Sequence, residues 1–376
     1  MRDRSWLKAC IVLLGAFAAG ACSDGGGEAT AASGLTSAAA PEIIKYPDSD
    51  EHSLELRVMT YNIEGLPWPI RKSRAAAMER IGRALEAMRQ AGRAPHILLL
   101  QEGFIEEVER VIALGGYRLV ARGPTLEDEP RARSPFIAQS HREKRNPLKG
   151  EGIGKWLDGG LYILSDFPIL ETAVRPFSRD ACAGYDCAAN KGVLYARIAV
   201  PGLPAPLQMF TTHLNAHQDT DVPPARSRAA HKAQVAEMAE FLAAHVDPDL
   251  PLIFGGDFNT RDKPERYAHL EGHPQFRVVR QLCAEAIDCD LGMPLTGERP
   301  WLESQDLQGF IPSDGIRIRP VEARIPLESA EGPDRLSDHD AYLVTYELRW
   351  SRPQTHAGRT ETSPKNGAGP SLGRRQ

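Results

Sequence analysis

The feature that most constrains the fold of this chain is a polar motif beside each of five apolar, strand-like runs. The runs are residues 56–61, 97–100, 207–212, 250–254 and 341–349. Short runs rich in large apolar residues predict strands that are buried in a sheet. Polar side chains at strand ends gather at one rim of a sheet, so that residues far apart in the sequence can form one site there.

The segments between these runs indicate how the sheets are covered. Residues 73–90 and 225–245 have the spacing of amphipathic helices, and residues 160–164 and 193–200 are further strand candidates. No internal repeat is visible. Many strands and few long helices predict an α/β protein, in which two sheets pack together and are flanked by helices.

The five motifs carry the residue types of a hydrolytic metal site. In chain order they are Tyr61-Asn62-Ile63-Glu64-Gly65, Gln101-Glu102, Thr212-His213-Leu214-Asn215, Gly256-Asp257-Phe258-Asn259 and Ser337-Asp338-His339-Asp340. Taken singly, each has a plainer interpretation, because Asp and Asn often only cap a turn. All five together, in this order, favour a catalytic site.

The series Asn62, Glu102, His213, Asp257-x-Asn259 and Ser337-Asp338-His339 resembles the catalytic set of the endonuclease/exonuclease/phosphatase superfamily. The resemblance extends over about residues 55–349. It implies a four-layered α/β sandwich and hydrolysis of a phosphoester with a divalent metal ion.

The metal expected from these residues is Mg²⁺, with Mn²⁺ able to substitute. Mg²⁺ binds through one or two carboxylates together with water and substrate phosphate. Glu102 is expected to supply a carboxylate, with Asn62 and Asp338 as further metal contacts.

His339 is the expected general base, since an imidazole accepts a proton near neutral pH. It needs a carboxylate to fix its tautomer, and Asp314 is the candidate. Asp314 lies in a segment that resembles the family's Asp-Tyr-Ile element, with Gly315 in place of the tyrosine.

The remaining catalytic residues would act on water and on the phosphate. Asp257 and Asn259 are expected to orient the attacking water and the scissile phosphate, and His213 to donate to the phosphate oxygens. Water attacks the phosphate directly in this scheme, without a covalent intermediate.

The segment Asp186-Cys187-Ala188-Ala189-Asn190-Lys191-Gly192 narrows the substrate. It resembles the Asp-x₄-Lys-Gly element that precedes a strand in neutral sphingomyelinases, where the Asp–Lys pair completes the active site. Asn215 belongs to a motif that resembles the same enzymes and is assigned to substrate binding. The plainer interpretation of Asp186 and Lys191 is a turn with a surface ion pair.

Three functions remain open. The first is hydrolysis of sphingomyelin to ceramide and phosphocholine, or of a similar phospholipid. The second is a nuclease or another phosphatase of the superfamily, and the third is a non-catalytic surface lipoprotein. The net charge of −5 offers no basic footprint, so no nucleic-acid partner is expected. A monomer is expected.

One local exception to the acidic balance is residues 131–155, which hold seven Lys or Arg against two Glu, with Phe136 within and Trp156 just after. The segment either contacts anionic lipid or phosphate, or is a solvated loop. The membrane-inserting aromatic hairpin of secreted bacterial sphingomyelinases is not evident in the sequence.

Residues 1–22 have the pattern of an export signal, with a basic start followed by an apolar run that is too short to span a bilayer. The end of the run fits either a cleavage site or a bacterial lipoprotein box in which Cys22 is lipidated. An exported protein is therefore expected, either anchored in the cell envelope, with the outer membrane as the expected site, or secreted. Residues 23–44 are expected to be a flexible tether, 45–350 the catalytic domain, and 351–376 a disordered tail.

Four cysteines remain after Cys10 and Cys22, and they allow three pairings. Export favours disulfides over free thiols. The sequence spacing suggests Cys182–Cys187 and Cys283–Cys289. A zinc site is disfavoured, because neither pair has the C-x₂-C spacing.

Overall fold

A computed structural model describes residues 40–218, 220–272, 277–285, 289–292, 299–332 and 334–351. The expected signal segment, Cys22, most of the tether and nearly all of the tail lie outside the described residues. Within them, no helix is both long and apolar enough to cross a bilayer.

One sheet has the strand order β11-β13-β14-β2-β3-β5-β4, and β1 pairs with β2 beside this path. Its strands are β1 (Ile43–Tyr46), β2 (Glu51–Asn62), β3 (Ile97–Gln101), β4 (Leu119–Arg122), β5 (Tyr162–Ser165), β11 (Asp290–Leu291), β13 (Ile316–Leu327) and β14 (Ala341–Ser351). The long strands β2 and β14 pair antiparallel along almost their whole length.

The other sheet has the order β10-β12-β9-β8-β7-β6. Its strands are β6 (Ile169–Pro176), β7 (Gly192–Ile198), β8 (Leu207–His213), β9 (Leu252–Asp257), β10 (Arg277–Val278) and β12 (Asp306–Ile311). The runs predicted as strands in the sequence are therefore strands, with ends shifted by a few residues.

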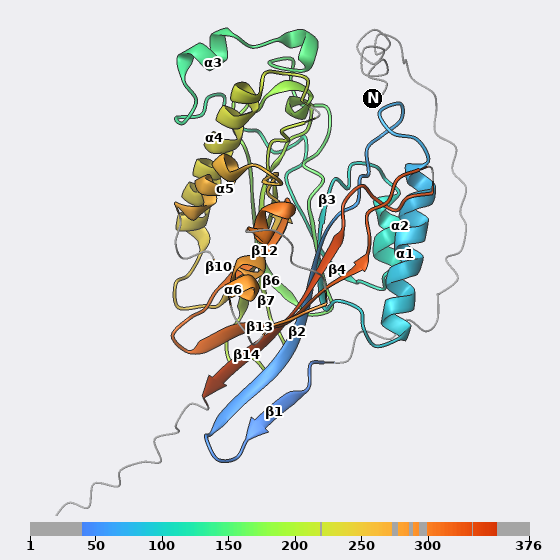
Figure 1. Ribbon diagram of the computed structural model, residues 1–376, viewed down its shortest axis with the longest axis vertical. Helices are drawn as coiled ribbons and strands as arrows, with labels where there is room; N and C mark the ends of the chain where they lie inside the picture. Colours follow the sequence, from blue (N-terminus) through green and yellow to red (C-terminus); the bar gives the residue numbers. More distant parts are fainter. Residues whose placement is uncertain are drawn as a thin grey trace, which may run out of the picture.

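Helices cover the outer faces of both sheets (Figure 1). On one side lie α1 (Arg74–Gln90) and α2 (Val108–Leu114), and on the other α4 (Pro224–His245) and α5 (Pro264–Glu271). The shorter elements are α3 (Gln139–Glu143), η2 (Pro147–Lys149), η3 (Gly184–Ala188), α6 (Val279–Glu285) and η4 (Pro300–Glu303).

The alternation of side chains along β2 shows why the chain folds into four layers. Leu56 and Val58 point into the cluster between the two sheets, where they join Leu194 and Met209 of the second sheet. Tyr61, on the opposite face, belongs to the cluster formed with α1 and α2. Because successive strand residues face opposite sides, both faces of β2 are buried. The four-layered α/β sandwich expected from the sequence is confirmed.

The strand directions bring the polar motifs together. β2 runs parallel to β3, which places Asn62 beside Gln101, and β8 runs parallel to β9, which places His213 beside Asp257. Antiparallel β12 begins opposite Asp257. β14 begins beside the end of β2 and runs away from it, so all these ends share one rim of the sandwich.

Candidate active site

Four of the expected site residues stand at the carboxyl ends of the central parallel strands. Asn62, His213 and Asp257 end β2, β8 and β9, and Glu102 directly follows β3. Glu102 has a φ of 57°, in the left-handed region. A glutamate adopts this conformation at a cost. Glu64 and Asn259, in two of the other motifs, have a positive φ as well, although so do residues in turns outside the motifs, such as Asp50.

The side chain of Asn62 holds two carboxylates in place. Its Nδ2 donates to Glu102 Oε1 at 2.9 Å and to Asp257 Oδ2 at 3.1 Å. Its Oδ1 accepts the backbone N–H of Glu64 at 3.0 Å, so the amide has one orientation that satisfies all three contacts. The oxygen of Asn62 is thus engaged, and its amide nitrogen orients the carboxylates of Glu102 and Asp257.

The carboxylates of this rim are crowded. Glu102, His213 and Asp257 present ligand atoms within 4.8 Å of one another, as do Asp257, Asp306 and His339. Burial raises the pKa of Glu102, and Asp338 adds to the rise. Burial also raises the pKa of Asp257 to about 7, although His339 opposes it. These two carboxyl groups with raised pKa values, Asp257 buried and Glu102 16% exposed, form a site where added positive charge is stabilising.

His339 is held by Asp306, which begins β12. His339 Nδ1 lies 2.8 Å from Asp306 Oδ2, and both side chains are nearly buried. Burial alone lowers the pKa of His339, but the charge and hydrogen bond of Asp306 outweigh it and raise this pKa to about 10. The remaining imidazole nitrogen, Nε2, faces the site, 3.9 Å from Asp257 Oδ2.

The sequence-based assignment of Asp314 as the partner of His339 is wrong. Asp314 is exposed and lies in the turn between β12 and β13, beyond the far end of β12 from Asp306. The resemblance to the family's Asp-Tyr-Ile element misplaced the residue by eight positions along the chain. The strand at residues 306–311 was not predicted from the sequence. Because it pairs antiparallel with β9, its first residue, Asp306, lies opposite Asp257 at the rim.

The loop that carries His339 is tied to β2. Ser337 Oγ donates to the carbonyl of Asn62 at 2.7 Å and accepts the backbone N–H of His339 at 3.1 Å. Asp338 points outward, with 42% of its side chain exposed and its Oδ1 4.0 Å from His339 Nε2. The Ser-Asp-His motif therefore presents a buried imidazole and an accessible carboxylate side by side.

Lys191 and Asp186 reach the site from the segment before β7. Lys191 Nζ lies 2.9 Å from Asp186 Oδ1 and 3.0 Å from His213 Nε2, and its side chain is only 5% exposed. His213 Nε2 is in turn 3.4 Å from Asp257 Oδ2. Burial, together with the charge of Lys191, lowers the pKa of His213 well below its usual value. The pair is not a surface ion pair: it abuts the rim.

Asn215 and Asn259 support the turns that follow β8 and β9. Asn215 Oδ1 accepts the backbone N–H of Ala183, and its Nδ2 donates to the carbonyl of Ala216. Both polar atoms of its side chain are engaged, which makes Asn215 a positioning residue in this structure. Asn259 Nδ2 donates to the carbonyl of Leu214 at 2.9 Å, and its backbone N–H donates to Asp257 Oδ1.

Sequence reasoning also missed Arg266 on α5. This buried guanidinium donates to the carbonyls of Asn215, Ala216 and Asn259, and so clamps the two turns together. Burial lowers its pKa to about 10. An arginine on an amphipathic helix gives no sign of this role, because only the tertiary fold brings the two turns to it.

The comparison with protein families agrees with this geometry. The sequence model of the endonuclease/exonuclease/phosphatase family matches residues 59–339, from within β2 to His339. The chain belongs to the endonuclease/exonuclease/phosphatase family. The match includes every catalytic, metal and substrate residue proposed from the sequence. A search of curated proteins found no match.

Solved structures share the fold of this family member at low sequence identity. Beta toxin from Staphylococcus aureus with bound magnesium ions has a TM-score of 0.50 and 14% identity, covering 79% of this chain and 100% of the other. Sphingomyelinase C from Streptomyces griseocarneus has a TM-score of 0.51 and 18% identity, covering 77% of this chain and 99% of the other. TDP2 from D. rerio, complexed with a single-stranded DNA product, has a TM-score of 0.50 and 15% identity, covering 78% of this chain and 98% of the other.

The donor set of this family member fits the divalent metal that such enzymes generally use. Glu102, His213 and Asp257 form one group of side chains that could hold a metal ion, and the accessible carboxylate of Asp338 lies 4.0 Å from His339 Nε2. Hard cations such as Mg²⁺ and Mn²⁺ bind carboxylate oxygen and keep positions for water and phosphate.

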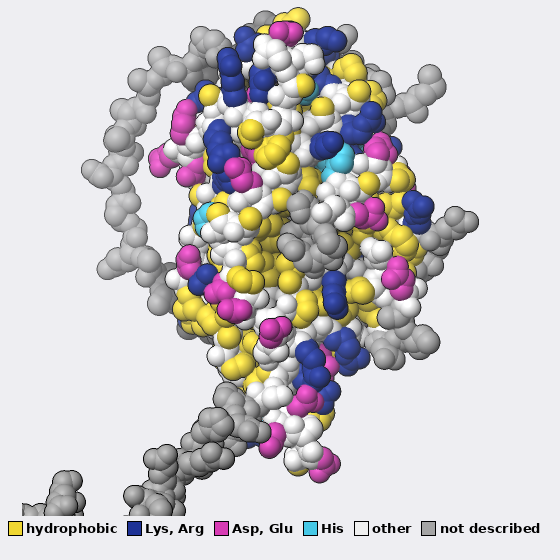
Figure 2. Space-filling view, turned by 90° about the vertical axis from the view of Figure 1, so that its left-hand side faces the viewer, with side chains coloured by type: hydrophobic (Ala, Val, Ile, Leu, Met, Phe, Trp, Pro, Cys, Tyr) yellow, Lys and Arg dark blue, Asp and Glu magenta, His cyan; other side chains and the backbone are white. Residues whose placement is uncertain are grey.

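The basic segment of the sequence lies around α3, at one end of the face shown in Figure 2. Several of its cations have acidic partners, such as Arg131 with Glu240 and Arg142 with Asp180. The aromatic side chains of Phe136 and Trp156 are exposed, at 49% and 45%. The segment is thus partly neutralised and presents apolar groups to solvent.

Proposed function

We propose that this family member is a Mg²⁺-dependent phosphodiesterase that removes the headgroup of a phospholipid, with sphingomyelin, cleaved to ceramide and phosphocholine, as the expected substrate. The observation that carries the substrate assignment is the Asp186–Lys191 pair. Its ammonium reaches the imidazole of His213 at 3.0 Å, where a substrate phosphate would be bound.

The metal residues in this proposal are Glu102 and Asp338, with Asn62 orienting Glu102. When bound, a divalent cation neutralises charge on the phosphate and makes the phosphorus easier to attack. Mn²⁺ is expected to substitute for Mg²⁺ because it takes the same oxygen ligands.

His339 takes the proton of the attacking water in this scheme. Asp306 accepts from His339 Nδ1, so Nε2 is the nitrogen that acts as the base. Gln305 Nε2 lies 3.1 Å from this nitrogen and would give way to the attacking water. Since the carboxylates of Asp306, Asp257 and Asp338 favour the protonated imidazole, the base needs added positive charge nearby to be neutral at physiological pH. A cation at Glu102 has that effect, because a like charge lowers the pKa of an imidazolium.

The other residues act on the phosphate and the water. Lys191 supplies a point positive charge to a phosphate oxygen. His213 Nε2 accepts from this ammonium in the structure, so it would donate to the phosphate only once the phosphate has drawn Lys191 onto its own oxygen. Asp257 and Asn259 orient the water from the end of β9. Asp257 also contacts both Asn62 and His213. Its carboxylate would therefore link the metal residues to the residues that contact the phosphate.

We further propose that the protein is exported, and that Cys22 carries a lipid that anchors it at the bacterial cell envelope, with the secreted form as the alternative. Both disulfides expected for an exported chain are present, Cys182–Cys187 and Cys283–Cys289. The partner would be a phospholipid at a membrane surface. We expect the protein to act as a monomer and without nucleic acid.

A second candidate function is cleavage of a DNA phosphodiester, which is favoured by the similarity to TDP2 with its DNA product. Purified protein tested with Mg²⁺ against sphingomyelin, phosphatidylcholine, phosphoinositides and plasmid DNA separates the two. Preferential hydrolysis of sphingomyelin supports the proposal, and a preference for DNA overturns it. Absence of all hydrolysis would favour the third candidate, a non-catalytic lipoprotein.

The Asp186–Lys191 pair is tested by a double-mutant cycle on sphingomyelin. We expect Asp186→Ala and Lys191→Ala each to lower turnover, with strongly non-additive effects, because residues that act as one unit fail together. Mn²⁺ titration should show that both variants still bind metal. Glu79→Ala breaks an exposed ion pair with Arg83 and is the matched control, which should leave turnover unchanged. Wild-type turnover in both single variants would remove the support for the lipid assignment.

A further inference from the structure

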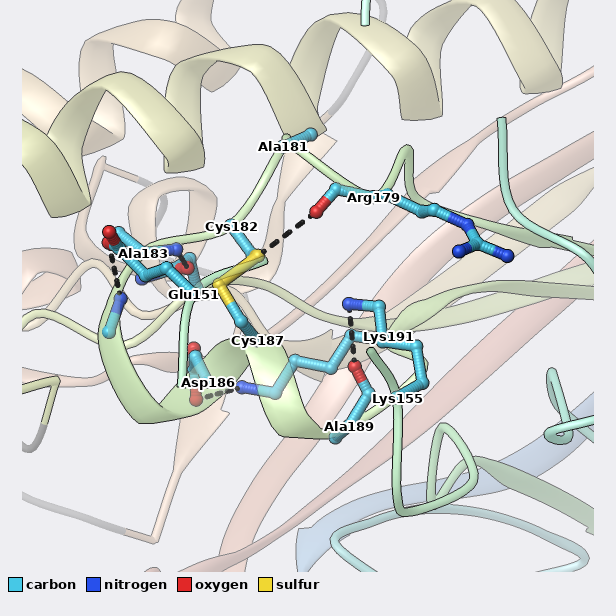
Figure 3. The surroundings of a disulfide bond; sticks show 12 residues. Glu151, Lys155, Arg179, Ala181, Cys182, Ala183, Asp186, Cys187, Ala189 and Lys191 are labelled. Atoms are coloured by element: carbon cyan, nitrogen blue, oxygen red, sulfur yellow. Dashed lines mark hydrogen bonds and ion pairs between the residues drawn. A yellow bond between two sulfur atoms is a disulfide. The ribbon is translucent and has the colours of Figure 1, made fainter. Parts of the chain in front are cut away.

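The Cys182–Cys187 disulfide lies directly beside Asp186 (Figure 3). The two cysteines are five residues apart, and their side chains are 6% and 3% exposed. The closed ring contains Asp186, so the disulfide restrains the backbone on both sides of the carboxylate. Few covalent restraints could act so close to a residue that contacts the site.

Asp186 makes its contacts outside this ring. Its Oδ1 pairs with Lys191 Nζ at 2.9 Å, and its Oδ2 accepts the backbone N–H of Ala216 at 2.6 Å. Ala216 follows the turn after β8, and Lys191 contacts His213 at the end of β8. The position of one carboxylate therefore determines where an ammonium stands relative to the phosphate site.

The backbone around Asp186 has little regular structure to hold it. η3 (Gly184–Ala188) is one short 3-10 turn, and such turns have poor hydrogen-bond geometry. Within the ring, Gly184 N–H donates to Glu151 Oε1 and Tyr185 N–H donates weakly to the carbonyl of Thr220, at 3.4 Å. Just beyond the ring, Ala188 accepts from Trp156 N–H. Between these anchors the disulfide is the covalent restraint on Asp186.

We propose that the Cys182–Cys187 disulfide is a positioning element of the active site, which holds Asp186 so that Lys191 stands beside His213. The inference rests on the proposed function and deepens it. Without the bond, Asp186 withdraws from Lys191 and Ala216, and the ammonium loses its fixed position. Turnover then falls although the fold and the metal residues remain.

The chain contains a matched control in its second disulfide. Cys283–Cys289 spans six residues with a Cα–Cα distance of 5.3 Å, against five residues and 5.2 Å for Cys182–Cys187. Cys283 packs in the core cluster with Phe310, near the end of β12 that is distant from Asp306. Because the two loops are so similar in length, the loss of either bond should lower the thermal midpoint by a similar amount.

The experiment compares Cys182→Ser/Cys187→Ser with Cys283→Ser/Cys289→Ser, each well below its thermal midpoint. We expect only the first pair to lower kcat on sphingomyelin, by about 10–10²-fold, as misplacement of a catalytic charge by about 1 Å does. Adding the first pair to Asp186→Ala should lower kcat no further. Wild-type kcat in the first pair, or a full additional loss in the Asp186→Ala background, would overturn the proposal.

A second readout does not depend on catalysis. The amide of Ala216 donates to Asp186, so its hydrogen exchange should accelerate in Cys182→Ser/Cys187→Ser and in Asp186→Ala, but not in the control pair. Unchanged protection of Ala216 in the first pair contradicts the proposal. If the serine pair unfolds, Cys182→Ala/Cys187→Ala avoids burying two hydroxyls. Unfolding of that pair as well, with the control pair folded, would assign the bond to global stability and overturn the proposal.

Failure of the proposed function gives a different result. If the wild-type protein leaves sphingomyelin intact but cleaves bis(p-nitrophenyl) phosphate, the lipid assignment fails. The same variants measured on that phosphodiester, together with the exchange of Ala216, then test the positioning role by itself.

Discussion

Replacing Asp306 with Asn tests the His339–Asp306 pair at nearly constant side-chain volume. The carboxylate lies 2.8 Å from His339 Nδ1 and favours the protonated imidazole, whose pKa is raised to about 10. The amide keeps a hydrogen-bonding group but removes the negative charge. We expect kcat to fall, and the acidic limb of the pH–rate profile to move to lower pH, because an imidazolium with less negative charge beside it loses its proton more readily.

The size of the effect follows from the contact that is lost. A hydrogen bond to a charged group contributes about 1.5–3 kcal/mol, and each 1.36 kcal/mol changes a rate about tenfold. Asp306→Asn should therefore lower kcat by about 10–10²-fold. Loss of the base itself in His339→Ala should cost about 10²–10⁴-fold. The asparagine variant is thus expected between the wild type and His339→Ala.

The assay is hydrolysis of sphingomyelin with saturating Mg²⁺ over a range of pH, with circular dichroism to confirm folding. Asp314→Asn is the matched control, since Asp314 is exposed in the turn after β12 and should keep wild-type rates. Wild-type kcat in Asp306→Asn, or an equal loss in both variants, would refute the assignment. A shift of the acidic limb to higher pH would show that the electrostatic argument has the wrong sign.

Three further predictions concern the metal, the water and the anchor. EDTA should abolish hydrolysis and Mg²⁺ or Mn²⁺ should restore it, because Glu102 and Asp338 offer hard oxygen ligands; full activity in EDTA, or recovery with Zn²⁺ alone, contradicts this site. Asp257→Ala should lower turnover about as much as His339→Ala while circular dichroism shows an intact fold, and near-native turnover would remove its role in orienting water. Mass spectrometry of the exported protein should find a lipid on Cys22 that Cys22→Ser abolishes, and a cleaved chain that begins without a lipid would identify the secreted form instead.

Much of the fold can be predicted from the sequence, because its strands are short, apolar and bounded by polar motifs. The runs 56–61, 97–100 and 207–212 are strands β2, β3 and β8. Residues 97–100 are continuously apolar because the strand is buried on both faces, and the other two runs keep large apolar residues between their polar ones. The run that begins at Asp306 carries Gln308 and Gly309 at its centre, so its apolar pattern is weak. This segment becomes strand β12 because it pairs with β9, and that pairing cannot be predicted from the local sequence.

The site residues likewise divide into those that the local sequence predicts and those that depend on tertiary contacts. Residues that end predicted strands, such as Glu102 and Asp257, meet as expected, because parallel neighbours deliver their ends to one rim. The partner of His339 was misassigned, since the choice between two aspartates depends on a strand register. The clamp made by Arg266 was missed, because it acts through backbone carbonyls that any sequence would supply.

The pairing of β2 with β14 has a consequence for the timing of activity. Thr60 lies opposite Tyr342, and Ser337 bonds to the carbonyl of Asn62, so the first and last motifs of the domain are neighbours. A ribosome or a secretion channel releases the chain from its N-terminus. β2 therefore stays unpaired with β14 until nearly the whole domain has emerged. Such long-range pairing slows folding. It also means that a nascent or truncated chain lacks the rim at which the first and last motifs meet, so the candidate site forms only once the whole domain has been synthesised.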